Sequence, residues 1–265
     1  MNTPAVNMTK VAAIDVLARM GYTARALVYL TVGSLAVLTA ADLGGKTTNS
    51  RGAVREIAEQ PFGQILLVLL VVGLVGYVIW RSTQALRDTD NHGTSVKGLG
   101  VRAGLFISAV SHGALAWFTA KLVWFGSDSR EAEPTWLSSD LGLWLLAVVG
   151  VGMAVAGVAH MIKGWNVGYE KYMRLPPAQI FWLRPLCRFG LLARGAVLIL
   201  IGVILARSAL VAHSSEIKGI ADALSSLQNN PYGAWLLGFV ALGLVAFGCY
   251  SLLEAKFRRI NADEK

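Results

Sequence analysis

Residues 62–80 read FGQILLVLLVVGLVGYVIW, nineteen residues without a charge. A helix rises about 1.5 Å per residue, so this stretch has about the length that crosses a bilayer core of roughly 30 Å. Five other apolar stretches of similar length lie on either side of it. The six predicted transmembrane spans are 22–41, 62–80, 103–125, 141–162, 189–211 and 232–253.

The composition agrees with a membrane protein. Of the 265 residues, 55% are hydrophobic and only 15% are charged, against about 25% charged residues in soluble domains. The mean hydropathy is +0.54. Six spans and their connections use nearly the whole chain, so we expect one membrane domain, residues 1–265, and no sizeable soluble domain.

The net charge of +8 does not predict nucleic-acid binding, because the basic residues flank hydrophobic spans. Membrane orientation and lipid headgroups explain them better. With the N-terminus inside, the inner segments hold 17 of the 24 Lys and Arg residues, and the outer segments hold 7 of them with 9 of the 16 acidic residues. This bias predicts a multi-pass protein of the bacterial inner (plasma) membrane with both termini in the cytoplasm.

The first and fifth spans open alike, with RMGYTARA at 19–26 and RFGLLARG at 188–195. The third span keeps part of this pattern in RAG at 102–104. The second and sixth spans start with QPFG at 60–63 and NPYG at 230–233, and Gly142 has the equivalent place in the fourth.

Ten residues after the glycine that opens each even-numbered span comes another glycine, Gly73, Gly152 or Gly243. The number of residues between the opening arginine and the glycine that opens the second helix is similar in the three copies. The repetition predicts three tandem helical hairpins, which we call modules 1, 2 and 3. Their predicted bounds are 17–87, 98–169 and 186–259.

These motifs resemble the domain-of-unknown-function 1206 family from about residue 17 to residue 259. The resemblance implies a bacterial membrane protein with three paired-helix modules and no established activity. The middle copy departs most from the pattern, because Ser108 replaces the second arginine and no proline precedes Gly142.

Two outer connections also show a helical period. Apolar residues alternate with charged ones over 53–60, and a similar pattern covers 220–227, each followed by a proline. We therefore expect short interfacial helices in outer loops 1 and 3. The fold class predicted is an all-α integral membrane protein of six transmembrane helices in three tandem hairpins.

Glycines inside the spans indicate close helix packing, because small residues let helix backbones approach each other in lipid. The glycines of the fourth and sixth spans that carry this prediction are Gly150, Gly152, Gly157, Gly238, Gly243 and Gly248.

Two arginines lie deeper in the membrane than the others. Arg25 and Arg194 each come six residues after an opening arginine, about 9 Å along the helix. A charge at that depth is costly unless it finds a partner or snorkels to lipid phosphate. Gln84 and Glu254 end the second helices of the same modules, so we hypothesise an Arg194–Glu254 ion pair and an Arg25–Gln84 hydrogen bond, with snorkelling as the alternative.

His112 lies near the middle of the third span and raises the question of a haem. His160 lies at the inner end of the fourth span, at a depth that differs by roughly 10 Å. Two ligands of one iron need nearly the same level, so we expect no haem and interpret His112 as a packed or hydrogen-bonded side chain.

The sequence lacks the HExxH, GxSxG and GxxxxGK[ST] motifs, and we expect no catalytic residue, metal or cofactor. Two function classes remain. The favoured one is a structural or lipid- and partner-binding membrane protein, and the alternative is a channel or transporter with a path among the hairpins or between the protomers of a homo-oligomer.

Basic residues at the inner ends of the modules are the candidate contacts for anionic headgroups, the alternative being that they only oriented the chain during insertion. These residues are Arg87, Arg174, Arg184, Arg188, Arg258 and Arg259.

Overall fold

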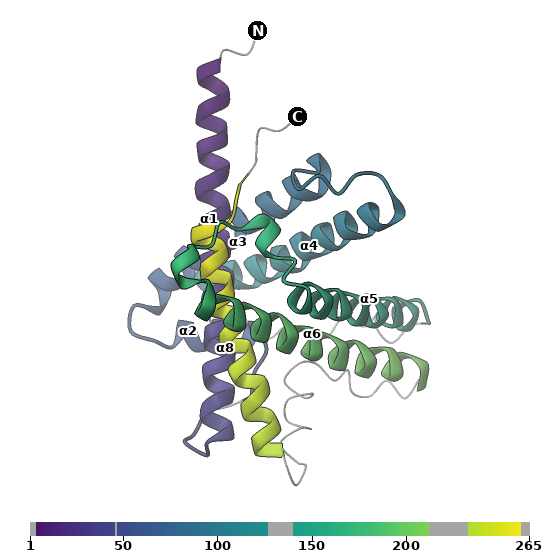
Figure 1. Ribbon diagram of the computed structural model, residues 1–265. Helices are drawn as coiled ribbons and strands as arrows, with labels where there is room; N and C mark the ends of the chain where they lie inside the picture. Colours follow the sequence, from purple (N-terminus) through teal and green to yellow (C-terminus); the bar gives the residue numbers. More distant parts are fainter. Residues whose placement is uncertain (1–3, 46, 127–139, 212–232, 261–265) are drawn as a thin grey trace.

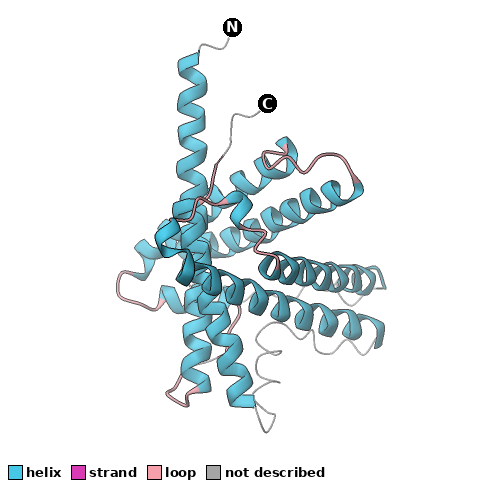
Figure 2. Cartoon of the chain, viewed as in Figure 1, coloured by secondary structure: helices cyan, strands magenta, loops and turns pink. Residues whose placement is uncertain are grey.

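The computed structural model describes residues 4–45, 47–126, 140–211 and 233–260, which form helices joined by loops and turns (Figure 2). Six helices in this described part are long and apolar enough to cross a membrane, which confirms the predicted number of spans. They are α1 (Pro4–Ala40), α3 (Gly63–Arg87), α4 (Val96–Phe125), α5 (Asp140–Trp165), α6 (Ile180–Val211) and α8 (Gly233–Phe257).

Several helices continue beyond their apolar stretches. Helix α3 runs on past Trp80 to Arg87, and α6 begins at Ile180, before the predicted start of its span. Polar side chains on these extra turns have partners nearby, since Gln84 donates to Asp90 in the following loop and Arg184 pairs with Glu170. Between α5 and α6 lie two short 3₁₀ helices, η2 (Glu170–Tyr172) and η3 (Pro177–Gln179).

The helices pack in a cyclic order of modules. The three largest helix–helix interfaces join α3 to α4, α5 to α6, and α8 to α1 (Figure 1). In each of them, the second helix of one module packs against the first helix of the next, with module 3 followed by module 1. The interfaces inside modules 1 and 3, between α1 and α3 and between α6 and α8, are smaller.

Module 2 differs, because α4 and α5 do not pack extensively against each other over their described residues. Helix α4 lies along α3, while α5 lies along α6 (Figure 1). The three repeats predicted from sequence are therefore present, but the middle pair is spread apart and its two helices belong to different interfaces.

The glycines of the module openings show the same difference at atomic scale. A Cβ atom on Gly21 would lie 2.6 Å from the backbone of Tyr77, and one on Gly190 would lie 2.5 Å from the backbone of Phe247. These contacts lie inside modules 1 and 3, where only glycine leaves room for the second helix. The equivalent Gly104 of module 2 has no described neighbour within 4 Å.

The predicted packing role holds for most of the other glycines. Gly150 and Gly157 in α5 meet the backbone of α6, and Gly248 in α8 meets Leu30 of α1. Gly152 is the exception, because no described atom lies within 4 Å of its Cβ position.

The first predicted interfacial helix is present as α2 (Ser50–Ala58). The Asn49 side chain caps it by accepting hydrogen bonds from two backbone N–H groups. Ala53, Val54 and Ile57 form its buried face, which packs against α1, α3 and α4. Helix α2 thus joins module 1 to the first helix of module 2. The predicted helix over 220–227 lies outside the described residues.

Candidate functional site

The arginine that opens module 1 binds the end of the second helix of module 3. Arg19 Nη1 donates hydrogen bonds to the carbonyl oxygens of Ala255 and Lys256, at 2.7 and 3.0 Å. Carbonyls in the last turn of a helix have no partner inside that helix, so an arginine is a suitable cap. The contact closes the cycle of modules between α1 and α8.

The opening arginine of module 2 makes the equivalent contact with module 1. Arg102 Nε and Nη2 donate to the carbonyl oxygens of Ala85 and Leu86, at 2.7 and 3.1 Å. In module 3 the guanidinium of Arg188 lies 5.5 Å from the ring centroid of Trp165, which has the position of Leu86 in the repeat. The RxG motif is therefore a joint between successive modules.

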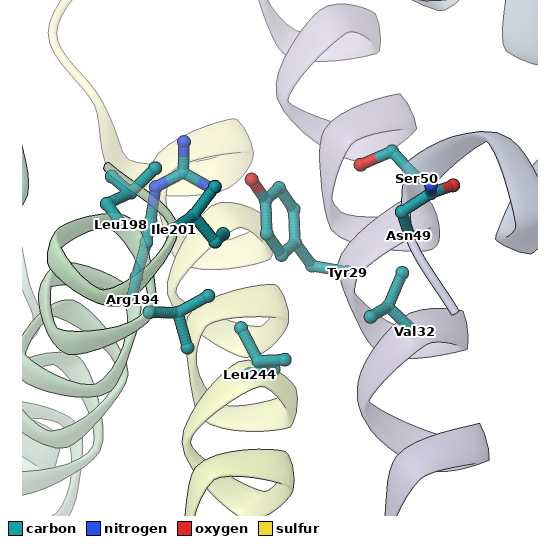
Figure 3. A pocket seen from close by; sticks show the side chains of 9 residues that line it. Tyr29, Val32, Asn49, Ser50, Arg194, Leu198, Ile201 and Leu244 are labelled. Carbon is teal, nitrogen blue, oxygen red and sulfur yellow. The ribbon is translucent and has the colours of Figure 1, made fainter. Parts of the chain in front are cut away.

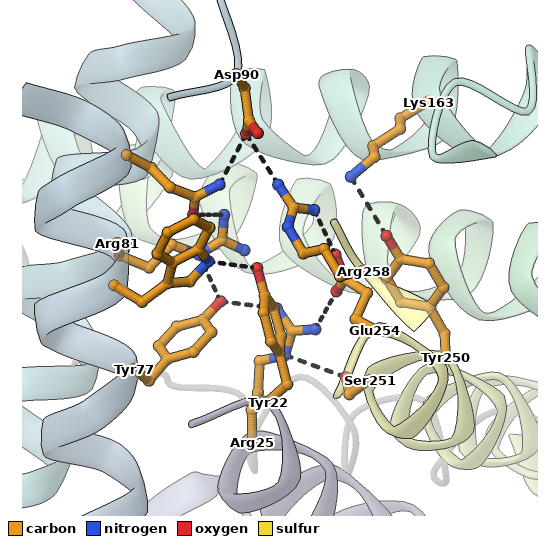
Figure 4. A network of polar contacts seen from close by, with 12 residues as sticks. Tyr22, Arg25, Tyr77, Arg81, Asp90, Lys163, Tyr250, Ser251, Glu254 and Arg258 are labelled. Atoms are coloured by element: carbon orange, nitrogen blue, oxygen red, sulfur yellow. Dashed lines mark hydrogen bonds and ion pairs between the residues drawn. The ribbon is translucent and has the colours of Figure 1, made fainter. Parts of the chain in front are cut away.

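Arg25, six residues further along α1 than Arg19, is buried at the contact between modules 3 and 1. It forms an ion pair through Nη2 with Glu254, and the two residues are only 4% and 1% exposed. Arg25 Nε donates to Ser251 Oγ at 3.1 Å, and Nη1 donates to the hydroxyl oxygen of Tyr77 at 2.7 Å. All three nitrogens of this guanidinium thus have acceptors (Figure 4).

The second oxygen of Glu254 accepts a hydrogen bond from Arg258 Nη1 at 2.9 Å. Arg258 Nη2 donates in turn to Asp90 in the α3–α4 loop, also at 2.9 Å. Gln84 Nε2 donates to the same Asp90 oxygen at 2.7 Å. Each carboxylate therefore receives two donors, the arrangement that lets buried charges persist in an apolar surrounding.

Aromatic hydroxyls complete what we call the polar network. Arg81 Nε donates to the Tyr77 hydroxyl at 2.8 Å, and Trp80 Nε1 donates to the Tyr22 hydroxyl at 2.9 Å. Figure 4 shows these side chains converging from α1, α3, α8 and the α3–α4 loop. The members of the network are Tyr22, Arg25, Tyr77, Trp80, Arg81, Gln84, Asp90, Ser251, Glu254 and Arg258.

The loop that supplies Asp90 has its own stabilising contacts. The Asp88 carboxylate accepts hydrogen bonds from the backbone N–H groups of His92 and Gly93, both at 2.8 Å. The Gly93 N–H, followed by that of His92, holds the pKa of Asp88 below its ordinary value despite opposing desolvation. The loop geometry thereby fixes Asp90 beside Arg258.

Both hypothesised pairings were wrong. Glu254 binds Arg25 instead of Arg194, and Gln84 binds Asp90 and Arg81 instead of Arg25. The hypothesis paired groups inside one hairpin, whereas the largest interfaces join successive modules. The cyclic order brings the end of α8 against α1, and with it Glu254 against Arg25.

The structure also corrects one of the predicted lipid contacts. Arg258 is 4% exposed and is held by two carboxylates, so it does not face the headgroups. Arg184 is exposed but forms a two-bond ion pair with Glu170, at 2.8 and 3.0 Å. Arg188 lies over Trp165, as described above. The predicted contacts with exposed side chains and no ion pair in the described structure are Arg87, Arg174 and Arg259.

Arg194 has a different environment from Arg25. Its guanidinium carbon lies 4.6 Å from the ring centroid of Tyr29 and 4.4 Å from that of Phe247. Its Nε and Nη1 atoms are buried and have no hydrogen-bond partner in the described structure. Figure 3 shows this guanidinium beside Tyr29, at a small pocket that also reaches Asn49 and Ser50.

A larger cavity of about 260 Å³ lies next to this pocket, and we call it the axial cavity. Positions ten residues after each opening arginine contribute to its wall, namely Tyr29, His112 and Leu198 from the three modules. Arg25 and Arg194 line it as well. The first helices of all three modules therefore surround the axial cavity.

His112 is a packed side chain, as interpreted from the sequence. Its Nδ1 lies 2.8 Å from the carbonyl oxygen of Ser108, and its ring centroid lies 4.5 Å from that of Tyr77. His160 Nδ1 similarly lies 2.8 Å from the Ala156 carbonyl oxygen. The described residues contain no group of three or more His, Cys, Asp or Glu side chains that could hold a metal ion.

The sequence interpretation missed Tyr22, Tyr77, Arg81 and Asp90 as members of the polar network. Tyr77 and Trp80 lie within an apolar stretch, where aromatic residues are expected as packing groups. Asp90 lies in a short loop with no helical register. The excess of cations near the ends of α3 and α8 was the available signal, because buried arginines need carboxylates.

Six membrane-length helices in three repeated pairs, joined by a buried polar network, define a multi-pass helical membrane protein. The chain belongs to the family described as Domain of Unknown Function (DUF1206), whose profile matches residues 20–88, 103–166 and 189–258. The three matches coincide with the three modules.

A similar protein is "Uncharacterized protein YxxB" of Bacillus subtilis (strain 168). It is 32% identical over 250 residues, which cover 92% of this chain and 90% of the relative. No solved structure matches the chain.

Proposed function

We propose that this is a non-catalytic protein of the bacterial inner (plasma) membrane that binds anionic lipid headgroups at its basic end, the end with Arg87, Arg174 and Arg259. The observation that carries the proposal is the exposure of these three side chains beside an Arg258 that is buried on carboxylates. Each exposed cation near an anionic leaflet contributes about 1 kcal/mol of attraction.

The proposal places the basic end in the cytoplasm, together with both termini. The excess of Lys and Arg in the segments on that side supports this orientation, because positively charged loops are retained inside. The α3–α4 loop and the connection between α5 and α6 would then face the inner leaflet.

Cysteine labelling tests the orientation. In a background lacking Cys187 and Cys249, a cysteine at Ser129 or Ser214 should react with an impermeant thiol reagent in intact cells. A cysteine at Ser95, the N-cap residue of α4, should react only after permeabilisation. Labelling of the Ser95 variant in intact cells would reverse the orientation.

Thermal unfolding in defined lipid tests headgroup binding. The purified protein should have a higher Tm in nanodiscs with phosphatidylglycerol or cardiolipin than in phosphatidylcholine, and the difference should shrink at high salt. The double variant Arg87→Gln/Arg174→Gln should lose most of this difference.

The matched control removes two cations from the opposite helix ends, Lys121→Gln/Arg207→Gln, and should keep the full lipid effect. Equal melting curves of the unaltered protein in anionic and zwitterionic lipid at low salt would contradict headgroup binding. The role of the exposed arginines would then be to orient the chain during membrane insertion.

The alternative function is passage of a small solute or ion among the hairpins or between protomers. The specific observation that favours it is the axial cavity, which is lined by all three modules. Its test is flux of labelled ions into proteoliposomes, with chemical cross-linking to show whether a homo-oligomer is present. Flux that persists when a side chain lining the cavity is enlarged, as in Leu198→Trp, would contradict a path through the cavity.

A further inference from the structure

We infer that the axial cavity is a binding site for a small oxyanion, a carboxylate or phosphate group, whose main ligand is the guanidinium of Arg194. The site is separate from the basic end and does not depend on headgroup binding there. Three features of the described residues carry the inference, namely the missing acceptors around Arg194, the aromatic rings on the faces of its guanidinium and the absence of carboxylates from the cavity wall.

Arg25 and Arg194 are equivalent positions of modules 1 and 3, but their acceptors differ. The three groups that accept from Arg25 are Glu254, Ser251 and Tyr77. Counted from the module glycines, Lys163, His160 and Phe247 have the equivalent positions around Arg194.

None of the three replacing side chains accepts a hydrogen bond from Nε or Nη1 of Arg194 in the described structure. A lysine stands in place of the carboxylate and donates to the hydroxyl of Tyr250, with Nζ 3.3 Å away. The phenylalanine ring has no hydroxyl, and the Nδ1 atom of His160 is engaged by a backbone carbonyl. Module 3 thus keeps the arginine, but the side chains at all three positions that accept hydrogen bonds from Arg25 are replaced.

The rings around Arg194 lie over its faces and do not accept its N–H groups. Tyr29 and Phe247 both lie within 5 Å of the guanidinium carbon, as cation–π partners. The N–H donors of a guanidinium lie in its plane, so stacked rings do not satisfy them. Nε and Nη1 are buried without acceptors, and an oxyanion in the axial cavity would supply the acceptor that this guanidinium lacks.

The wall of the axial cavity has the charge that such a ligand needs. Arg25, Arg51 and Arg194 line the cavity, and none of its lining residues is Asp or Glu. Glu254 pairs with Arg25, whereas Nε and Nη1 of Arg194 have no partner in the described structure. The Tyr29 hydroxyl supplies a further donor beside Arg194. A volume of about 260 Å³ is several times that of one water, about 30 Å³, and accommodates a polyatomic anion.

The test measures Tm of the purified protein in neutral detergent, with chloride replaced by acetate or inorganic phosphate at constant ionic strength. At about tenfold excess over Kd, acetate or phosphate should raise Tm by roughly 3–5 °C. Arg194→Gln should abolish the rise. Arg207→Gln, which removes a cation from an exposed position of the same helix, should retain it.

A second arm separates a soluble oxyanion from a lipid headgroup. If the oxyanion is part of a lipid, phosphatidylglycerol in nanodiscs should raise the Tm of the protein, whereas acetate and phosphate should not. Arg194→Gln should reduce this lipid-dependent rise, and it should do so equally in the Arg87→Gln/Arg174→Gln background. If headgroups do not bind at the basic end, the Arg87→Gln/Arg174→Gln variant should show the same lipid-dependent rise in Tm as the unaltered protein, while the effect of Arg194→Gln stays unchanged.

The stability of Arg194→Gln without added anion separates ligand binding from a packing role. An unpaired buried cation is costly, so the variant should have a Tm equal to or above that of the unaltered protein in chloride. A rise in Tm that is equal with and without Arg194, or no rise with any of the three probes, would overturn the inference. A large loss of Tm in chloride would identify Arg194 as a packing residue and overturn it as well.

Discussion

Charges of opposite sign alternate along one line of buried side chains. Arg25 contacts Glu254, which contacts Arg258, which contacts Asp90. Removing one member of such a buried pair typically costs about 3–5 kcal/mol, because the partner stays buried without its counter-charge. An exposed ion pair contributes only about 0–1 kcal/mol. The network should therefore dominate the electrostatic part of the stability.

Glu254→Gln should lower the free energy of unfolding by about 3–5 kcal/mol, since Arg25 and Arg258 both lose their shared carboxylate. Reversible unfolding in detergent, followed by tryptophan fluorescence, measures the change. Glu170→Gln is the matched control, because its pair with Arg184 is partly exposed, and it should cost less than about 1 kcal/mol. Equal losses in the two variants would show that the network does not stabilise the fold.

At the scale of helix pairs, the opening glycine contacts the second helix of its own module in two of the three modules. Gly21 in module 1 and Gly190 in module 3 meet their second helices at backbone distance. Gly104, the same position in module 2, faces no described neighbour within 4 Å. The same position of the repeat thus contributes to helix packing in modules 1 and 3 but not in module 2, because different helices are in contact there.

Gly21→Leu and Gly190→Leu should each destabilise the protein by about 1–3 kcal/mol or more, because the side chain meets the backbone of the second helix. Gly104→Leu should not destabilise the protein, because the position is open and leucine has a higher helix propensity than glycine. Unfolding in detergent compares the three variants. A loss at Gly104 as large as at Gly21 would show that α4 and α5 pack together in solution.

The elements were predictable from sequence, whereas their partners were not. Apolar length located all six spans, and the glycine spacing located the three modules, because both signals are local in the chain. The pairing of Arg25 with Glu254 was missed because it depends on α1 packing against α8, a contact between the two ends of the sequence. The departures of the middle copy from the repeat pattern marked module 2 as different, but they did not indicate that α4 and α5 separate.

At the scale of the whole molecule, the contact between α1 and α8 is a noncovalent connection between the two ends of the sequence. It joins the first module to the last through Arg19, Arg25 and Glu254. The polypeptide itself joins α4 to α5, where the described helices have no extensive interface. The structure is thus held together across its termini more firmly than across its middle module.

This arrangement predicts that the chain can be divided in the middle. Residues 1–132 and 133–265, produced as two polypeptides in one membrane, should co-purify through a tag on either half, because the interface between α1 and α8 is kept whole and the cut falls between α4 and α5. Glu254→Gln in the second half should reduce recovery of the first several-fold, since it removes the carboxylate shared by Arg25 and Arg258. Glu170→Gln should leave recovery unchanged. Halves that never co-purify would mean that the α4–α5 connection, and not the contact between α1 and α8, holds the molecule together.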